Sequence, residues 1–422
     1  MRIGLQTFLS ILIVFLFMGF IPIGCTSSRE EYKSFLKEQL PNRPATLASS
    51  HLEACLKWTK ELGAHISHVH SSADGRYILL STSGEKKTEA AVRLLNMNGK
   101  ILWTRWIKQP IKSQSVSETG DRLAINSYDS KLKIYNPHGA LLWERDHLGR
   151  PVFFNKARRL LMLNDDDADP QTAFVVYDWN GKLQATAKLE DPKDEAVEIY
   201  TATDESAIAV ALKNQTILFY DQDGFIFSKH SLKKDVVSIG MQRNGINLFA
   251  YVLSTTRSDQ KQQLTVLQFD RGNTKKDVSA KVVSQIEFDR RYETLKPDAT
   301  NGRIWLYGNT KRGQAIASAV CRSGSDIKLE WEKSLPFPAN YSYLTSTTTN
   351  SMTIAIEPTD PAGVTDILGI SSVGDAIFQA RVPAESGLFS YTYASNADLL
   401  VAGAGDPGKG KLFAYQVKQS CR

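Results

Sequence analysis

Three of the chain's seven histidines stand within six residues, as His65, His68 and His70. Imidazole is a common ligand of zinc and other transition metals, so metal binding is the first chemistry to consider. On an extended strand, His68 and His70 share one face and His65 points the other way. Two ligands without a third are too few for a protein zinc site. We therefore predict no metal site and keep His68 and His70 as the alternative metal ligands.

Two further patterns resemble ligand sites. Asp165-Asp166-Asp167-Ala168-Asp169-Pro170 has the alternating carboxylates of a calcium loop, but Pro170 replaces the turn glycine and no glutamate follows at the required spacing. We predict a solvated loop there.

Gly403-x-Gly405-x-x-Gly408 matches a dinucleotide-binding fingerprint. That fingerprint requires a helix directly after it, whereas residues 411–415 have the pattern of a strand. The sequence therefore predicts no enzyme and no cofactor.

The first residues have the pattern of a targeting signal. Arg2 precedes an apolar run over residues 8–21, which is shorter than the ~20 residues that a membrane-spanning helix needs. The run ends in Ile21-Pro22-Ile23-Gly24-Cys25, which resembles a bacterial lipobox. We predict that residues 1–24 are a signal peptide and that Cys25 is lipidated; an ordinary signal peptide cut near Gly24 or Ser27 is the alternative.

Thr26 follows Cys25. An aspartate at this position would resemble an inner-membrane retention signal, and the sequence has none there. This resemblance implies an outer-membrane lipoprotein that faces the periplasm, and a soluble periplasmic or secreted protein is the alternative. Removing Arg2 with the signal lowers the formal net charge from +6 to +5. No run of five like charges occurs, so we expect no nucleic-acid partner.

Residues 25–53 are predicted to form a tether that contains one short helix. Ser28 can cap this helix with Glu31 as its capping-box partner, and apolar residues follow at helical spacing until Pro41. A tether that docks on the body of the protein is the simpler interpretation. An amphipathic helix that binds a partner is the alternative.

The remaining chain is a series of short apolar strands with a repeat of about 40 residues. Asn96-Met97-Asn98-Gly99-Lys100-Ile101-Leu102-Trp103 is followed by Asn136-Pro137-His138-Gly139-Ala140-Leu141-Leu142-Trp143, and the turn glycines continue at Gly181 and Gly224. Repeats of ~40–50 residues with four strands are typical of propeller blades. Each glycine marks a tight turn between the third and fourth strands of a blade. Later turns near Gly272, Gly324 and Gly374 extend the series.

The sequence also predicts how the ring closes. The last apolar strand, residues 412–415, has third-strand character with no fourth strand after it, whereas Cys55-Leu56-Lys57-Trp58-Thr59-Lys60 resembles the fourth strand Ile101-Leu102-Trp103-Thr104-Arg105-Trp106. Pairing residues 411–419 antiparallel with residues 54–62 would leave no open edge. We predict an all-β, eight-bladed propeller over residues 54–422, with seven blades as the alternative because residues 270–300 are hard to assign. His68 and His70 would then line the central channel.

Three of the four cysteines lie in or near the predicted propeller. The predicted pairing brings Cys421 close to Cys55, and an oxidising compartment favours a disulfide between them. Two unrelated free thiols are the alternative. Cys321 is predicted to stay unpaired in a third strand.

The unit that ends in Gly-Lys-Ile-Leu-Trp resembles the repeats of quinoprotein-like propellers, most specifically in the first two blades. The resemblance implies that a tryptophan of the outer strand packs between neighbouring blades, and Trp58, Trp103, Trp143 and Trp331 fit that role. The Cys-Cys pair and the Cys-x-x-Cys-His motif of quinone-dependent dehydrogenases are absent from the sequence.

A lipid-anchored eight-bladed propeller is similar to the BamB family, lipoprotein scaffolds of the machinery that assembles outer-membrane β-barrels. The resemblance implies a non-catalytic scaffold that binds envelope proteins and is held at the membrane by its lipid. A propeller enzyme, or a binder of a metal or small ligand in the central channel, is the alternative.

Overall fold

The computed structural model describes residues 52–419. Gaps in this range fall at 87–88, 148, 165–170, 192, 245, 257–260, 270–277, 279, 299–302, 310–313, 324–325, 339–343, 347–350, 357–363, 372–374, 384–387, 395 and 405–408. The chain divides into two compact units, Met1–Ala45 and Thr46–Arg422, and the described residues all belong to the second. The predicted signal peptide, Cys25, the predicted helix and the aspartate run at 165–170 lie outside them.

The described residues form 32 strands in eight four-stranded antiparallel sheets, which we number as blades in chain order. Blade 1 contains β2 (His65–Ser71), β3 (Tyr77–Lys86), β4 (Glu89–Asn96) and β5 (Ile101–Ile107). Blade 2 contains β6 (Ile111–Val116), β7 (Leu123–Ser127), β8 (Lys131–Tyr135) and β9 (Leu141–Asp146). Blade 3 contains β10 (Gly149–Phe154), β11 (Arg159–Asn164), β12 (Thr172–Asp178) and β13 (Leu183–Lys188). Blade 4 contains β14 (Ala196–Thr201), β15 (Ala207–Leu212), β16 (Thr216–Asp221) and β17 (Ile226–Ser231).

The second half of the chain keeps the same order. Blade 5 contains β18 (Asp235–Asn244), β19 (Asn247–Thr255), β20 (Gln262–Phe269) and β21 (Ala280–Phe288). Blade 6 contains β22 (Arg291–Pro297), β23 (Arg303–Asn309), β24 (Gln314–Ser323) and β25 (Asp326–Pro338). Blade 7 contains β26 (Leu344–Ser346), β27 (Ser351–Ile356), β28 (Val364–Ser371) and β29 (Ala376–Pro383). Blade 8 contains β30 (Leu388–Ala394), β31 (Leu399–Ala404), β32 (Lys411–Lys418) and β1 (Glu53–Glu61).

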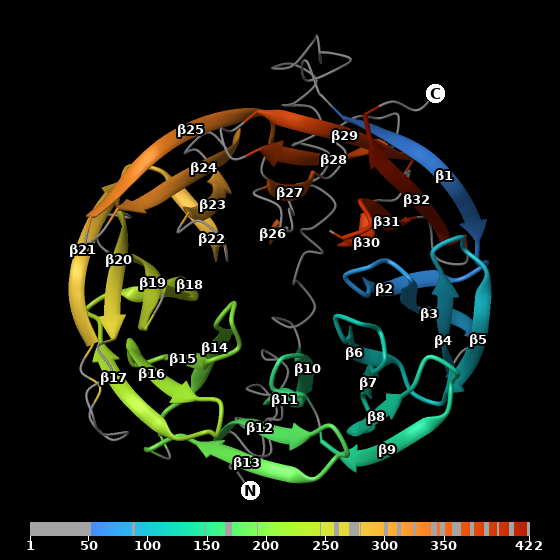
Figure 1. The fold of residues 1–422 in the computed structure, drawn as a ribbon, viewed down its shortest axis with the longest axis horizontal. Coiled ribbons are helices and arrows are strands. Elements are labelled where there is room, and N and C mark those ends of the chain that lie inside the picture. Colours follow the sequence, from blue (N-terminus) through green and yellow to red (C-terminus); the bar gives the residue numbers. More distant parts are fainter. Residues whose placement is uncertain are drawn as a thin grey trace, which may run out of the picture. The chain divides into compact units, whose positions relative to one another are not determined.

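The blades of this unit are arranged around one axis, with the first strand of each blade nearest the axis (Figure 1). The predicted all-β propeller is therefore confirmed. The region that was hard to assign supplies the last strand of blade 5 and the first strand of blade 6. Within the described residues, the number of sheets is the one that the eight-blade prediction requires.

The middle strands of the blades are apolar because both of their faces are covered. All six residues of β15 are buried, and they are only alanine, isoleucine, valine and leucine. Sheets packed on both faces favour such continuous apolar runs. Between blades 3 and 4, Phe174 and Tyr220 meet edge to face with ring centroids 5.1 Å apart, within a shared hydrophobic cluster. Similar clusters join blades 1 and 2, 2 and 3, 4 and 5, 5 and 6, 7 and 8, and 8 and 1.

The ring closes through β1, as the sequence predicts. This strand pairs antiparallel with β32, from Glu61 opposite Lys411 to Glu53 opposite Lys418, in a sheet of order β1-β32-β31-β30. Figure 1 shows β1 on the outside of the ring beside β32. The outer strand of blade 8 thus comes from the opposite end of the chain to its other three strands.

Candidate functional site

Tryptophans of the outer strands contact the turn of the next blade. The indole Nε1 atoms of Trp58, Trp103 and Trp143 donate hydrogen bonds to the carbonyls of Met97, Pro137 and Trp179, at 3.0, 3.0 and 3.1 Å. In each case the acceptor lies in the turn between the third and fourth strands of the following blade. These contacts join blade 8 to 1, 1 to 2 and 2 to 3.

The turn glycines leave room for these rings. Gly99, Gly139 and Gly181 have φ values of +76°, +81° and +81°. A Cβ atom on Gly181 would lie 2.6 Å from the ring of Trp143. Glycine is therefore required twice, by the left-handed backbone and by the close approach of the indole. At Gly224, the corresponding neighbour is Ala185, so this contact lacks a ring.

Trp331 occupies the corresponding position of blade 6. It lies opposite Ala319 beside a β-bulge, and its ring packs edge-on to Trp305 of the same blade with centroids 6.0 Å apart. Two residues later, Lys333 forms an ion pair of 2.6 Å with Asp375 at the turn of blade 7. The turn residues 372–374, including Gly374, lie outside the described part of the chain.

The predicted orientation of His65 is wrong, because β2 contains a bulge. Ile66 lies opposite Thr82 and His68 opposite Ser81, so Ser67 is an extra residue in the ladder. A bulge reverses the alternation of faces. His65 is consequently in phase with His68 and His70, whereas the prediction assumed an unbroken strand.

Burial accounts for the properties of His68 and His70, the two alternative metal ligands. The Nδ1 atom of His68 lies 3.1 Å from Ser81 Oγ. Burial lowers the pKa of His68, opposed by a hydrogen bond to the backbone of Lys112 in blade 2. Burial, followed by the charge of His68, lowers the pKa of His70 to about 4. Across the residues that the structure describes, no group of three or more His, Cys, Asp or Glu residues could hold a metal ion.

The structure describes one predicted disulfide partner. Cys55 lies in β1 opposite Gln416 and is disulfide-bonded. Cys421 lies outside the described residues, so its pairing with Cys55 stays a prediction. The backbone of Cys321 lies in β24, the third strand of blade 6, as expected.

In blades 1 to 4, the turns that connect the first to the second strand and the third to the fourth strand lie on one side of the ring. Antiparallel strands place these two kinds of turn at the same end of a sheet. We call this side the turn face. In blades 1 to 4 it comprises residues 72–76, 97–100, 117–122, 136–140, 155–158, 179–182, 202–206 and 222–225.

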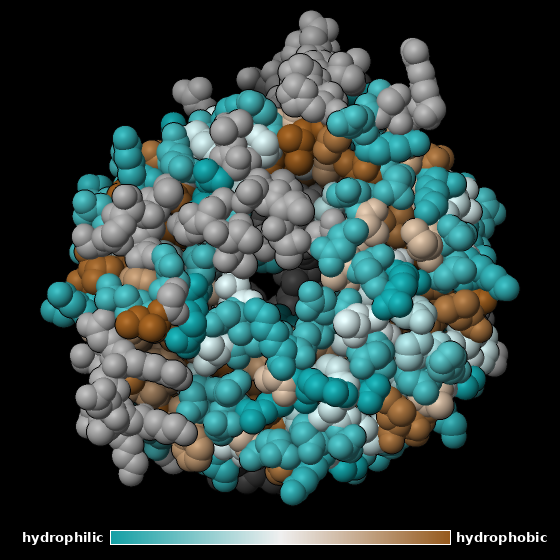
Figure 2. All heavy atoms as spheres, viewed as in Figure 1, coloured by the Kyte–Doolittle hydropathy of each residue, from teal (hydrophilic) through white to brown (hydrophobic). Residues whose placement is uncertain are grey.

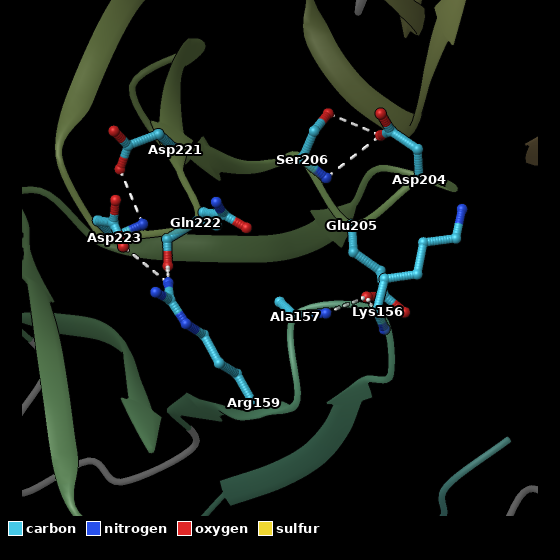
Figure 3. A pocket seen from close by; sticks show the side chains of 9 residues that line it. All are labelled: Lys156, Ala157, Arg159, Asp204, Glu205, Ser206, Asp221, Gln222 and Asp223. Atoms are coloured by element: carbon cyan, nitrogen blue, oxygen red, sulfur yellow. Dashed lines mark hydrogen bonds and ion pairs between the residues drawn. The ribbon is translucent and has the colours of Figure 1, made fainter. Parts of the chain in front are cut away.

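A polar pocket of roughly 560 Å³ lies on the turn face between blades 3 and 4 (Figure 3). The Glu205 carboxylate accepts hydrogen bonds from the backbone N–H groups of Asn155 and Lys156, at 2.7 and 2.9 Å. Arg159 pairs with Asp223 at 2.7 Å across the same gap. The pocket is thus built by contacts that hold the two blades together, and it was not found from the sequence because its residues come from three separate turns.

A second pocket, of roughly 550 Å³, lies among the inner strands β10, β14, β18 and β22. It contains an exposed ion pair of 3.4 Å between Arg150 and Glu198. Burial lowers the pKa of Lys296 and raises the pKa of Tyr200, both of which line the pocket. The sequence patterns did not single out these residues, which come from the inner strands of four blades.

The remaining motif lies in blade 8. Gly403 is inside β31, and the chain resumes as strand β32 at Lys411. The element that follows is a strand, as predicted, and a strand lacks the helix N-terminus by which a dinucleotide fingerprint binds phosphate. Among the described residues, no helix is long and apolar enough to span a membrane.

Comparison with known proteins identifies the fold. No protein-family model matches the sequence, and no match appears among curated proteins. The solved structure of BamB from Moraxella catarrhalis aligns with a TM-score of 0.55 at 15% identity, covering 86% of this chain and 99% of that one. Chaetomium thermophilum Sqt1, bound to the N-terminus of ribosomal protein L10, aligns with a TM-score of 0.59 at 9% identity, covering 84% and 97%. The C-terminal WD40 domain of Sif2 aligns with a TM-score of 0.56 at 11% identity, covering 86% and 98%. At these identities the likeness shows a β-propeller fold.

Proposed function

We propose that this chain is a non-catalytic, protein-binding scaffold of the bacterial cell envelope. The observation that carries the proposal is the closed ring itself, which begins 28 residues after a cysteine in a lipobox-like sequence. A propeller presents two broad faces of turns and loops, and such concentrated loops are suited to binding.

The neighbouring folds support a protein ligand. Sqt1, a propeller of similar extent, has been solved with the N-terminus of a ribosomal protein bound to it. BamB, another of the three neighbours named above, prompts the narrower proposal that this chain acts in outer-membrane protein assembly. Identifying the partner decides the narrower role, because one fold can carry many functions.

The membrane attachment is the second part of the proposal. Lipidation of Cys25 would hold the ring at the periplasmic side of the outer membrane through the predicted tether of residues 25–53. Metabolic labelling with a palmitate analogue should mark the wild-type protein and not Cys25→Ser. If the variant stays labelled, or if the wild type is never labelled and is recovered in the soluble periplasm, the lipid anchor is refuted.

The scaffold role is tested by affinity capture of the full chain from detergent-solubilised envelopes, followed by protein identification. We expect at least one envelope protein in stoichiometric amount. Recovery of outer-membrane assembly components would support the narrower role. If no stoichiometric partner is recovered under gentle extraction, the scaffold proposal fails.

A further inference from the structure

Two exposed leucines lie on neighbouring outer strands where blade 8 meets blade 1. Leu56 of β1 is 57% exposed, and Leu102 of β5 is 42% exposed. Leu56 directly precedes the bulge of β1, and Leu102 is the extra residue of the bulge in β5. Figure 1 shows β1 and β5 as successive strands on the rim of the ring. On the face seen in Figure 2, most strongly hydrophobic residues also lie towards the rim and not around the central opening.

Three lysines lie between these leucines along the rim, namely Lys57, Lys60 and Lys100. Lys57 is the extra residue of the bulge in β1. The indole of Trp58 donates to the carbonyl of Met97 at 3.0 Å, which holds β1 against the turn that contains Lys100. The outer strand of blade 8 and the last turn of blade 1 therefore form one continuous surface.

The position of Lys60 follows from the repeat. In β5 and β9, an arginine stands two residues after the tryptophan and donates to the carbonyl of the turn glycine in the next blade. Arg105 does so at 3.0 Å and Arg145 at 2.9 Å. Lys60 stands two residues after the tryptophan of β1, which places it beside the turn at 97–100.

The charges of these lysines are not neutralised by pairing. The side chains of Lys57, Lys60 and Lys100 form no hydrogen bond or ion pair with the residues that the structure describes. Lys57 and Lys100 are exposed, and Lys60 is half-buried.

Cations also outnumber carboxylates in the surrounding strands. The outer two strands of blades 8 and 1, together with the turn at 97–100, contain seven cationic residues and three acidic ones. They are Lys57, Lys60, Arg93, Lys100, Arg105, Lys411 and Lys418 against Glu53, Glu61 and Glu89. One further carboxylate, that of Asp398 in the first turn of blade 8, accepts a hydrogen bond from Tyr393 Oη at 2.8 Å. Counting Asp398 as well leaves this junction with a net positive charge.

The predicted tether joins the ring at the same junction. The strand that carries Leu56 and Lys57 begins at Glu53, so the chain that follows Cys25 arrives here. A lipid on Cys25 would hold this edge closer to the bilayer than blades 4 and 5, which lie across the ring (Figure 1). A tether raises the local concentration of what it connects, so a lipid surface is the occupant that this junction would meet first.

We propose that the edge formed by Leu56, Lys57, Lys60, Lys100 and Leu102, which we call the blade 8–1 edge, binds the surface of an anionic phospholipid bilayer. The leucines would enter the headgroup region, and the lysines would attract the anionic headgroups. This inference rests on the lipid anchor proposed above and adds the part of the ring that faces the membrane.

The test measures vesicle binding by the mature chain without its lipid, residues 25–422 carrying Cys25→Ser. Co-flotation compares vesicles of phosphatidylethanolamine and phosphatidylglycerol with vesicles of phosphatidylcholine alone. We expect binding to the vesicles that contain phosphatidylglycerol, and this binding should weaken as the salt concentration rises. Lys57→Gln or Lys60→Gln should weaken it about fivefold each. Leu56→Ser should also weaken it about fivefold, because about half of the side chain would leave water.

Blade 3 offers a matched control. Lys182 follows the turn glycine of blade 3 as Lys100 follows that of blade 1. Leu183 precedes the bulge of β13 as Leu56 precedes the bulge of β1, and it is 51% exposed. Leu56→Ser/Lys100→Gln should weaken vesicle binding about 25-fold, whereas Lys182→Gln/Leu183→Ser should bind like the parent chain. Urea unfolding checks that both variants are folded.

Two results overturn the proposal directly. The first is a parent chain that does not bind vesicles containing phosphatidylglycerol at low ionic strength. The second is a blade-3 variant that loses as much vesicle binding as Leu56→Ser/Lys100→Gln. The proposal is also overturned if Leu56→Ser/Lys100→Gln floats like the parent chain, and loss of an envelope protein from its affinity capture would then assign the edge to a protein partner.

Labelling with the palmitate analogue separates this proposal from the lipid anchor. If Cys25 is labelled but the chain without its lipid does not bind the vesicles, the anchor stands and the blade 8–1 edge is wrong. If Cys25 is never labelled and the chain binds vesicles through Leu56 and Lys100, the edge binds the membrane by itself and the anchor fails.

Discussion

The contact between Trp143 and the turn of blade 3 can be tested by adding a single methyl group. In Gly181→Ala, the new Cβ atom would meet three ring atoms of Trp143 at 2.6, 2.7 and 3.0 Å. Gly63→Ala is the matched control, because Gly63 has a similar positive φ of +66° but no atom within 4 Å of the added Cβ. Both variants carry the left-handed strain, and only one carries the clash.

The size of the effect follows from that difference. A non-glycine residue in the left-handed region costs about 1–2 kcal/mol. Trp143 cannot move freely, because its Nε1 donates to Trp179 and its ring packs on Tyr177 with centroids 5.8 Å apart. Forcing an extra methyl into such packing costs a further ~1–3 kcal/mol. Gly181→Ala should therefore lose about 2–5 kcal/mol of unfolding free energy, and Gly63→Ala about 1–2 kcal/mol.

Urea unfolding followed by far-UV circular dichroism measures both variants, and a double-mutant cycle identifies the cause. In a Trp143→Ala background the clash is gone, so Gly181→Ala should cost no more than Gly63→Ala. Equal costs for Gly181→Ala and Gly63→Ala in the native background would refute the packing argument. So would a cost of Gly181→Ala that does not change when the indole is removed.

Three further outcomes are expected. The buried Gln262 side chain donates a hydrogen bond to the carbonyl of Tyr292 and accepts one from its N–H. Gln262→Leu should therefore lower the unfolding free energy, measured by urea titration, by about 2–4 kcal/mol. An unchanged unfolding free energy would contradict this role of Gln262. Burial holds the pKa of His70 at about 4, below its ordinary 6.5. Between these two pH values the imidazole of His70 binds a proton in the unfolded chain and not in the folded one. The free energy of unfolding therefore falls as the pH drops from 6.5 towards 4. The loss of unfolding free energy is at most ~3 kcal/mol. His70→Gln should flatten this pH dependence of the unfolding free energy. If the variant keeps the wild-type profile, His70 is not its source. Mass spectrometry of non-reduced peptides should link Cys55 to Cys421, and a Cys55 peptide joined to any other cysteine would exclude that pairing.

The repeating part of the fold could be read from the sequence because it depends on local requirements. Gly99, Gly139 and Gly181 mark turns that need positive φ, and their spacing defines the blade before any contact is known. The likeness of the Trp58 and Trp103 segments was sufficient to predict that β1 completes blade 8, because an outer strand without a local partner must pair elsewhere. Both predictions follow from the backbone chemistry of single turns and strands.

Tertiary structure decided the features that combine several blades. The bulge at Ser67 reverses the side of His65 and depends on the ladder with β3, which a strict alternation of residues does not reveal. The turn-face pocket joins Arg159 to Asp223, 64 residues apart, through the packing of blades 3 and 4. A sequence encodes local backbone preferences directly, whereas side chains from separate turns acquire a common site only when the closed ring fixes their distances.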